Sequence, residues 1–147
     1  LGQEGFITNL SDNIGGRLWE GLDATVGYTM DLGEGRLNFG LNGYLSLKKR
    51  VEPILGEDSL AYDCSGVVSQ DCFTTPKWRH TATVNYQQDD WRVGLKWRFF
   101  GKVDYEGTAD KKLIADGGIS SYSFIDLSSD YAVNEHVTLT AGVNNII

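Results

Sequence analysis

The chain has 147 residues, a formal net charge of −7 and a pI near 4.7. This acidity disfavours nucleic acid as a partner, because phosphate binding requires clusters of Lys and Arg. No window approaches 18 consecutive apolar residues, so the sequence excludes a membrane-spanning helix. The 18 Gly, the 2 Pro and an aromatic content of 12 % instead suit strands, tight turns and a membrane–water interface.

Six runs of residues alternate with period two, and this alternation is the dominant pattern of the chain. In each run one parity is mainly apolar and the other is mainly polar or charged. In chain order the runs cover residues 22–30, 36–48, 78–87, 91–105, 125–133 and 137–144. Read as helices, they would place Arg and Trp on every side. Each run is therefore predicted to be a strand, and residues 6–10 fit the end of an earlier strand.

The length of these runs separates two classes of β protein. The run over 91–105 is far longer than the roughly 5–6 residues of an ordinary strand. A strand of about 13 residues spans about 43 Å, and a tilt of about 40–45° leaves roughly 30 Å of height. That height covers the apolar band of about 25 Å in an outer-membrane barrel. The pattern predicts strands that cross a membrane.

The connections alternate between short and long. Residues 32–35, 88–90 and 134–136 form short turns, whereas residues 51–77 and 107–121 form long polar loops. Outer-membrane barrels have short periplasmic turns and longer external loops. Three segments should then run toward the periplasm and three outward. The inward segments are 17–31, 78–88 and 122–133, and the outward segments are 36–52, 91–106 and 137–147.

Aromatic residues stand near both ends of the predicted strands. Rings with one polar edge prefer the membrane–water interface, so two aromatic girdles are expected. The alternative is cross-strand packing in an ordinary sheet. The residues beside the short turns are Tyr28, Tyr86, Trp91 and Tyr131, and those beside the long loops are Trp78 and Tyr105.

Both cysteines, Cys64 and Cys72, fall in the first long loop. An external loop lies in an oxidising compartment, so a disulfide is expected. A metal site is the alternative. Neither His80 nor His136 lies near the pair in the predicted topology, so four-ligand zinc binding has no support. The two histidines also lie on opposite sides of the membrane, and no catalytic constellation is evident.

Four basic residues share the polar parity of the run over 91–105. They are Arg92, Lys96, Arg98 and Lys102. If the apolar parity faces lipid, these side chains point into the lumen. They could steer an anionic ligand, or they could form salt bridges with acidic groups of neighbouring strands or of an internal domain. We favour the salt bridges.

Four segments together resemble the C-terminal part of the β-barrel of TonB-dependent outer-membrane receptors. They are 76–80 (PKWRH), 93–101 (VGLKWRFFG), 123–127 (SFIDL) with Tyr131, and 137–145 (VTLTAGVNN). The last resembles the family's penultimate strand, whose Gly-Val-x-Asn-Leu pattern normally continues into Phe-Asp. Here the chain reads Asn145-Ile146-Ile147. The cysteine pair before Pro76 is also similar to the family.

The resemblance implies an all-β fold: a partial C-terminal barrel domain over residues 1–147, without a plug domain. The piece would supply about six or seven long antiparallel transmembrane strands to a barrel of about 22 strands. We expect it to be incomplete at both ends, since residues 1–10 lack the features of a signal peptide and the chain stops inside a strand pattern.

The family also implies a location in the outer membrane of a Gram-negative bacterium, in contact with its lipid. The parent protein would not be an enzyme and would need no cofactor. It would import a scarce ligand (a ferric siderophore, a vitamin or an oligosaccharide) with energy from a TonB complex contacted by the missing N-terminal part. The alternatives are a passive porin or other outer-membrane barrel, a soluble β-sandwich binding module, and, ranked lowest, a membrane-barrel enzyme.

Overall fold

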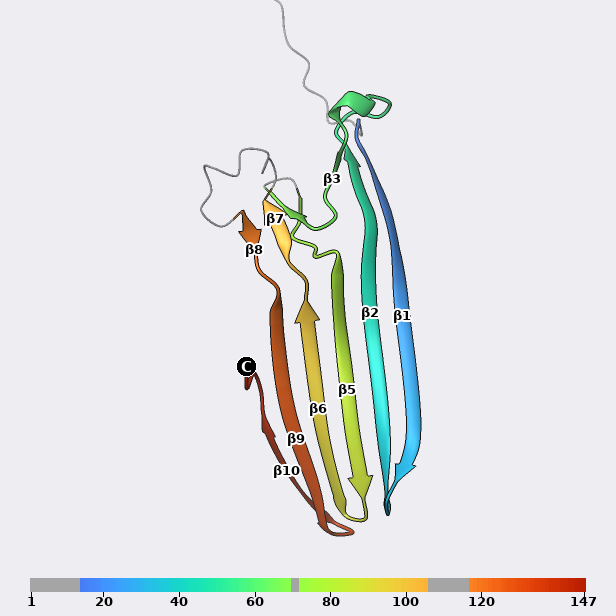
Figure 1. Ribbon diagram of the computed structural model, residues 1–147, viewed down its shortest axis with the longest axis vertical. Helices are drawn as coiled ribbons and strands as arrows, with labels where there is room; N and C mark the ends of the chain where they lie inside the picture. Colours follow the sequence, from blue (N-terminus) through green and yellow to red (C-terminus); the bar gives the residue numbers. More distant parts are fainter. Residues whose placement is uncertain (1–13, 70–71, 106–116) are drawn as a thin grey trace, which may run out of the picture.

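The structure, a computed structural model, describes residues 14–69, 72–105 and 117–147. Its main feature is an antiparallel sheet in which six strands follow the order β1-β2-β5-β6-β9-β10 (Figure 1). The bounds are Gly16–Leu32 for β1, Gly35–Glu52 for β2, Trp78–Gln88 for β5, Trp91–Phe100 for β6, Tyr122–Asn134 for β9 and Val137–Val143 for β10. The expected all-β antiparallel fold is confirmed. The described strands form an open sheet with β1 and β10 at its edges.

Two-residue turns join the strands in pairs at one end of the sheet (Figure 1). They consist of Gly33–Glu34, Asp89–Asp90 and Glu135–His136. Gly33 has φ +61° and Asp89 has φ +46°, the left-handed conformation that matches a hairpin turn to the twist of its strands. The long connections lie at the opposite end, so the predicted alternation of short turns and long loops is confirmed.

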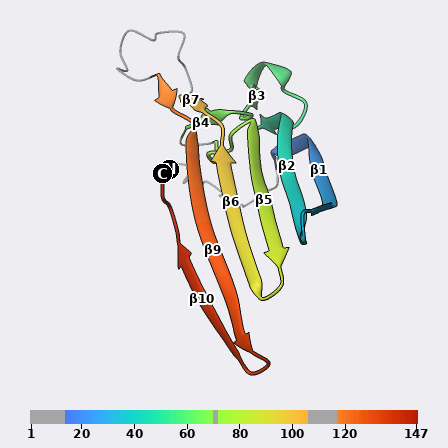
Figure 2. The ribbon, with the colours of Figure 1, turned by 60° about the horizontal axis from the view of Figure 1, so that its bottom comes forward.

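The register of the sheet gathers the apolar parities of all six strands on one face. One row across it joins Tyr28, Phe39, Val84, Leu95, Leu127 and Val143, each directly opposite the next. Because side chains alternate across a strand, a slip of one residue between any two strands would break this face. Figure 2 shows the six strands as a single layer. No second layer covers the apolar face in the part of the chain that the structure describes.

The other face of the sheet is polar. A row near its middle joins Thr25, Asn42, Thr81, Arg98 and Phe124. The apolar and polar faces follow the two predicted parities. The last apolar pair at the long-loop end is Leu22–Leu45, since a bulge between Glu20 and Gly21 follows it.

The buried residues gather at the long-loop end. There the 3-10 helix η1 (Asp58–Leu60) and the short strand β3 (Tyr62–Asp63) follow β2, with β3 paired to it. A small second sheet holds β4 (Val67–Val68), β7 (Val103–Tyr105) and β8 (Gly118–Ile119). The buried side chains are Ser46, Cys64, Ser65, Cys72, Pro76 and Val103. The first long loop is therefore a folded structure.

The single strand expected over 91–105 is wrong. Strand β6 ends at Phe100, and β7 belongs to the second sheet, where it pairs in parallel with β4. The neighbouring strand β5 begins only at Trp78, whose carbonyl oxygen accepts a hydrogen bond from the amide of Gly101 at 2.8 Å, so β5 offers no partner beyond Gly101. The loop residues of β4 supply that partner instead, and the amide of Asp104 donates to the carbonyl oxygen of Gly66 at 2.8 Å.

The strand end expected over residues 6–10 lies outside the described residues. Among the residues that the structure describes, no helix has the length and apolar character needed to cross a membrane.

Candidate functional site

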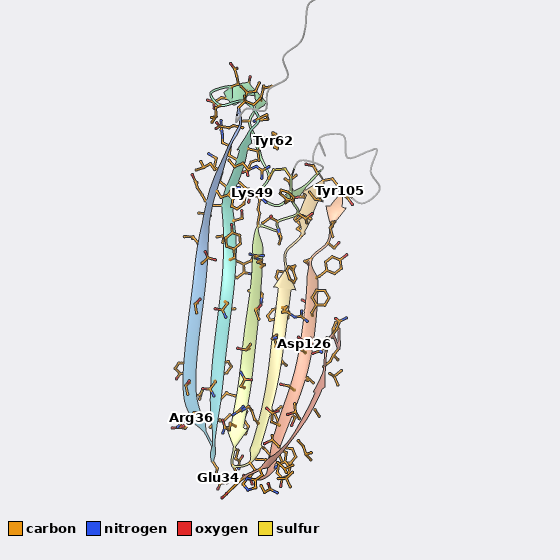
Figure 3. All side chains as sticks on the ribbon, turned by 180° about the vertical axis from the view of Figure 1, so that it is seen from behind. Glu34, Arg36, Lys49, Tyr62, Tyr105 and Asp126 are labelled. Carbon is orange, nitrogen blue, oxygen red and sulfur yellow. A yellow bond between two sulfur atoms is a disulfide. The ribbon has the colours of Figure 1, made fainter. Side chains whose placement is uncertain are left out.

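The polar face of the main sheet carries the candidate functional residues, together with the loop that closes over its long-loop end. Figure 3 shows the extent of this region: Glu34 and Arg36 lie at the short-turn end, Lys49, Tyr62 and Tyr105 at the opposite end, and Asp126 between them on β9.

Cross-strand hydrogen bonds connect polar side chains on this face. The Thr25 hydroxyl donates to Asn42 Oδ1 at 3.0 Å, and the Thr29 hydroxyl donates to Asn38 Oδ1 at 2.8 Å. The same type of contact joins Thr140 to Asp130 at 2.8 Å. Because each pair links neighbouring strands, the hydrogen bonds fix the register from the polar side.

Among the described residues of the polar face, Arg98 makes the shortest ion pair. Its Nη2 donates to both carboxylate oxygens of Asp126, at 3.1 and 3.0 Å. Asp126 Oδ1 also accepts a hydrogen bond from the backbone amide of Asn145 at 3.0 Å. The Asp126 side chain is only 13 % exposed, so this contact is partly shielded from solvent. Arg98 therefore links β6 to β9, and Asp126 links β9 to the residues after β10.

The other three basic residues are held less firmly. Arg92 Nη1 lies 4.0 Å from Asp130 Oδ2, and Lys102 Nζ lies 3.4 Å from Asp104 Oδ1. Lys96 lies between Thr83 and Asp126 in the register but makes no ion pair within the described residues. These contacts support the salt-bridge interpretation at Arg98. Lys102 falls in the break between β6 and β7, outside the main sheet.

The aromatic residues lie near the ends of the strands, with one departure. Tyr28, Tyr86, Trp91 and Tyr131 stand on the apolar face near the short turns, and the rings of Trp91 and Tyr131 are 4.4 Å apart. Trp78 stands at the long-loop end, where its Nε1 donates to His80 Nδ1 at 2.9 Å. Tyr105 lies in β7 of the second sheet. The girdle assignment stays a prediction for all six.

The predicted disulfide is confirmed. Cys64 and Cys72 are bonded, with their Cα atoms 5.3 Å apart. Their residues are 1 % and 2 % exposed. Bonded sulfur atoms that are this deeply buried cannot act as thiolate ligands, so the metal alternative is excluded.

The disulfide loop is attached to the long-loop end of β2. The Ser65 hydroxyl lies 3.0 Å from both the carbonyl oxygen and the hydroxyl of Ser46. Asp63 Oδ1 accepts from the backbone amides of Lys49 and Ser65, both at 2.9 Å. Ser46 belongs to the polar parity of β2, so the loop folds over the polar side of the sheet. Sequence reasoning missed these anchors, although Asp and Ser beside a cysteine are typical of tight local turns.

Lys49, near the end of β2, provides a further attachment of this loop. Its ammonium donates to the carbonyl oxygen of Phe73 at 3.3 Å and to the Thr75 hydroxyl at 2.8 Å, and it lies 5.4 Å from the Trp19 ring centroid. The loop over 72–77 is thus held from both β2 and the disulfide.

Comparison with known proteins identifies a family. The protein family described as "TonB dependent receptor-like, beta-barrel" matches residues 3–146. No curated protein and no solved structure matches the chain significantly. The family match spans nearly the whole sequence.

Proposed function

Because this chain belongs to the TonB dependent receptor-like β-barrel family, we propose that it forms part of the wall of a receptor that imports a scarce ligand with energy supplied through TonB. The family consists of outer-membrane transport receptors and is not enzymatic. Beyond membership of the family, we propose that this chain lies in a Gram-negative outer membrane, that transport is coupled to energy from TonB, and that the ligand is a siderophore, a vitamin or an oligosaccharide.

The two-faced sheet carries the proposal. Six strands expose a mainly apolar face on one side, where Val26 is 57 % and Leu127 is 41 % exposed. The other side carries the hydrogen bonds and the Arg98–Asp126 ion pair. Lipid on the first face and a water-filled lumen on the second satisfy both sets of side chains. A soluble β-sandwich would need a second layer over the apolar face.

The extent of the sheet supports a place in a larger barrel. Membrane barrels have at least about 8 strands, and the described main sheet has six long ones in an open arrangement. The chain would supply the C-terminal part of the wall. The plug and the segment that contacts TonB would come from other parts of the receptor. Arg92, Lys96 and Arg98 would then line the lumen, and the aromatic residues at the strand ends would mark the membrane interfaces.

Growth tests would separate this proposal from a passive porin. A strain without the receptor gene would be grown with iron chelated, with vitamin B12 limiting, or with an oligosaccharide as the only carbon source. We expect a growth defect in one condition, restored by the receptor gene only when TonB is intact. Restoration without TonB would indicate a porin and would contradict the proposal. Growth equal to the parent strain in all three conditions would also contradict it.

A further inference from the structure

We propose that the polar face holds a binding site, centred on Arg79, for an organic anion that carries a planar ring. The site rests on the proposed function, because a ligand can reach it only if this face lines the lumen. Arg79 was part of the segment 76–80 that resembles the receptor family, but neither the ion pairs nor the disulfide loop involves its charge.

The register places Arg79 in a transverse row of chemically matched residues. Tyr44 of β2 lies directly opposite it on one side and Phe100 of β6 on the other. The row continues to Asp23 of β1 and to Tyr122 of β9. A cation thus stands between aromatic rings on the polar face, with Phe100 39 % and Tyr122 55 % exposed.

Arg79 differs from the other arginines of the polar face. Arg98 and Arg92 each face a carboxylate on β9. Among the described residues, no carboxylate forms an ion pair with Arg79, and its guanidinium lies 5.1 Å from the Tyr44 ring centroid. Within the described residues this cation–π contact engages the charge of Arg79 while none of its N–H groups makes a hydrogen bond, so the N–H edge is available. That edge matches the two oxygens of a carboxylate, sulfonate or phosphate.

Two depressions in the surface meet at Arg79 and Phe100. One has a volume of about 400 Å³ and is lined by Asp23, Thr25, Asn42, Tyr44, Arg79 and Phe100 among others. The second has about 300 Å³ and is lined more by apolar atoms, with Pro76, Val103, Ile119 and Tyr122 in its wall. Volumes of 300 Å³ or more are those of small-molecule sites. A ligand with its anionic group at Arg79 could lay its ring on Phe100 and Tyr122.

Asp23 sets the direction in which the ligand lies. It is two strands from Arg79, which is about 10 Å at the usual strand spacing. Its negative charge repels an anion at the β1 side of the larger depression. The anionic group is therefore favoured beside Arg79, and the ring of the ligand would point toward β6 and β9. The second depression lies there, with Thr75 and Pro76 in its wall.

The test uses the full-length receptor in detergent and 2-naphthoate as the probe, with calorimetry as the measurement. We expect 2-naphthoate to bind, Arg79→Gln to weaken binding at least about tenfold, and Arg79→Lys to weaken it less, because Lys keeps the charge but loses the paired N–H groups. The uncharged 2-naphthamide should bind at least about tenfold more weakly than 2-naphthoate. Phe100→Leu should reduce the affinity for 2-naphthoate more than for cyclohexanecarboxylate.

Arg92→Gln is the matched control, since it removes an arginine from the same face at the short-turn end. It should leave the affinity unchanged. Every variant would first be shown to keep the heat-dependent gel mobility of a folded barrel. Absence of 2-naphthoate binding would overturn the inference. Equal affinity for the amide, or equal losses in the Arg79→Gln and Arg92→Gln variants, would also overturn it.

The result of the 2-naphthoate binding experiment can be distinguished from the result of the growth tests. A receptor that supports TonB-dependent growth but does not bind 2-naphthoate would refute the Arg79 site alone. A receptor that restores growth without TonB would refute the proposed function, whatever the calorimetry shows.

Discussion

Replacing Leu95 by Arg is expected to destabilise the folded barrel by about 2–4 kcal/mol, because the substitution places a charge in the lipid. Leu95 lies on the apolar face of β6, directly between Val84 of β5 and Leu127 of β9. The energetic cost of a lipid-facing charge depends on its depth in the bilayer, so the position of Leu95 along the strand determines how much stability is lost.

Leu95 lies midway between Trp91 and Phe99, which belong to the same strand and the same face. Four residues in either direction correspond to about 13 Å along the strand. With a tilt of about 40–45°, this becomes roughly 10 Å along the membrane normal, so both neighbours lie near the edges of an apolar band of about 25 Å. Leu95 is then close to the midplane, where the energetic cost is largest.

Asn85→Arg provides the matched control. Asn85 lies on the polar face of β5 at the same height, opposite Asn38 and Gly94. An arginine there would enter the lumen, so the free energy of unfolding should change by less than about 1 kcal/mol.

The assay is reversible unfolding of the full-length receptor from lipid vesicles in guanidinium chloride, followed by tryptophan fluorescence. Leu95→Arg should reduce the folded-to-unfolded ratio by roughly 30- to 1000-fold relative to the parent. The reasoning would be refuted if Asn85→Arg were as destabilising as Leu95→Arg, or if Leu95→Arg changed the free energy of unfolding by less than about 0.5 kcal/mol.

Three further predictions test individual contacts. Arg98→Ala should lower the unfolding free energy by about 1 kcal/mol, since the Arg98 side chain is 40 % exposed. Arg92→Ala should have almost no effect, because 4.0 Å separates Arg92 from Asp130. Equal losses of unfolding free energy in denaturant titrations would contradict this ranking. Replacing both cysteines by Ser should remove roughly 2–3 kcal/mol of loop stability and expose the peptide bond after Lys77 to trypsin, while the gel mobility of the barrel stays the same. Unchanged cleavage would show that the disulfide does not hold this loop in place. A methyl group at Gly43 would come within 2.4 Å of the Trp78 ring, while Gly27 has open space. Gly43→Ala should therefore shift the tryptophan emission and lower the free energy of unfolding by about 1 kcal/mol, whereas Gly27→Ala should be neutral or slightly stabilising. A larger loss of stability in Gly27→Ala than in Gly43→Ala would contradict this prediction.

The sequence was sufficient for the strands and the turns because local rules determine both. Alternation identified the two faces of each strand, and Gly33 and Asp89–Asp90 marked turns that require left-handed or tight backbone. The disulfide was also predictable, since both cysteines lie in one loop. The break after Phe100 was not predictable, because the alternating pattern continues to Tyr105 while the hydrogen-bonding partner of the strand changes from β5 to β4.

The candidate sites depended on register, and the sequence does not specify register across a long loop. Strands β2 and β5, which carry Tyr44 and Arg79, are connected by residues 53–77, and the length of this connection leaves the pairing of the two strands open. Only the structure brings Arg79 between Tyr44 and Phe100. For the same reason, the basic parity of β6 could be recognised in the sequence, but the choice of Asp126 as the partner of Arg98 could not.

Nitroxide scanning of residues 93–98 in the membrane-embedded receptor tests the central claim most directly, which is that the apolar face meets lipid and the polar face meets water. Collisions with oxygen report contact with lipid, and collisions with a water-soluble nickel chelate report contact with the lumen. We predict strict alternation, with oxygen favoured at Val93, Leu95 and Trp97 and nickel favoured at Gly94, Lys96 and Arg98. High nickel accessibility at both parities, or an alternation of the opposite phase, would contradict the account.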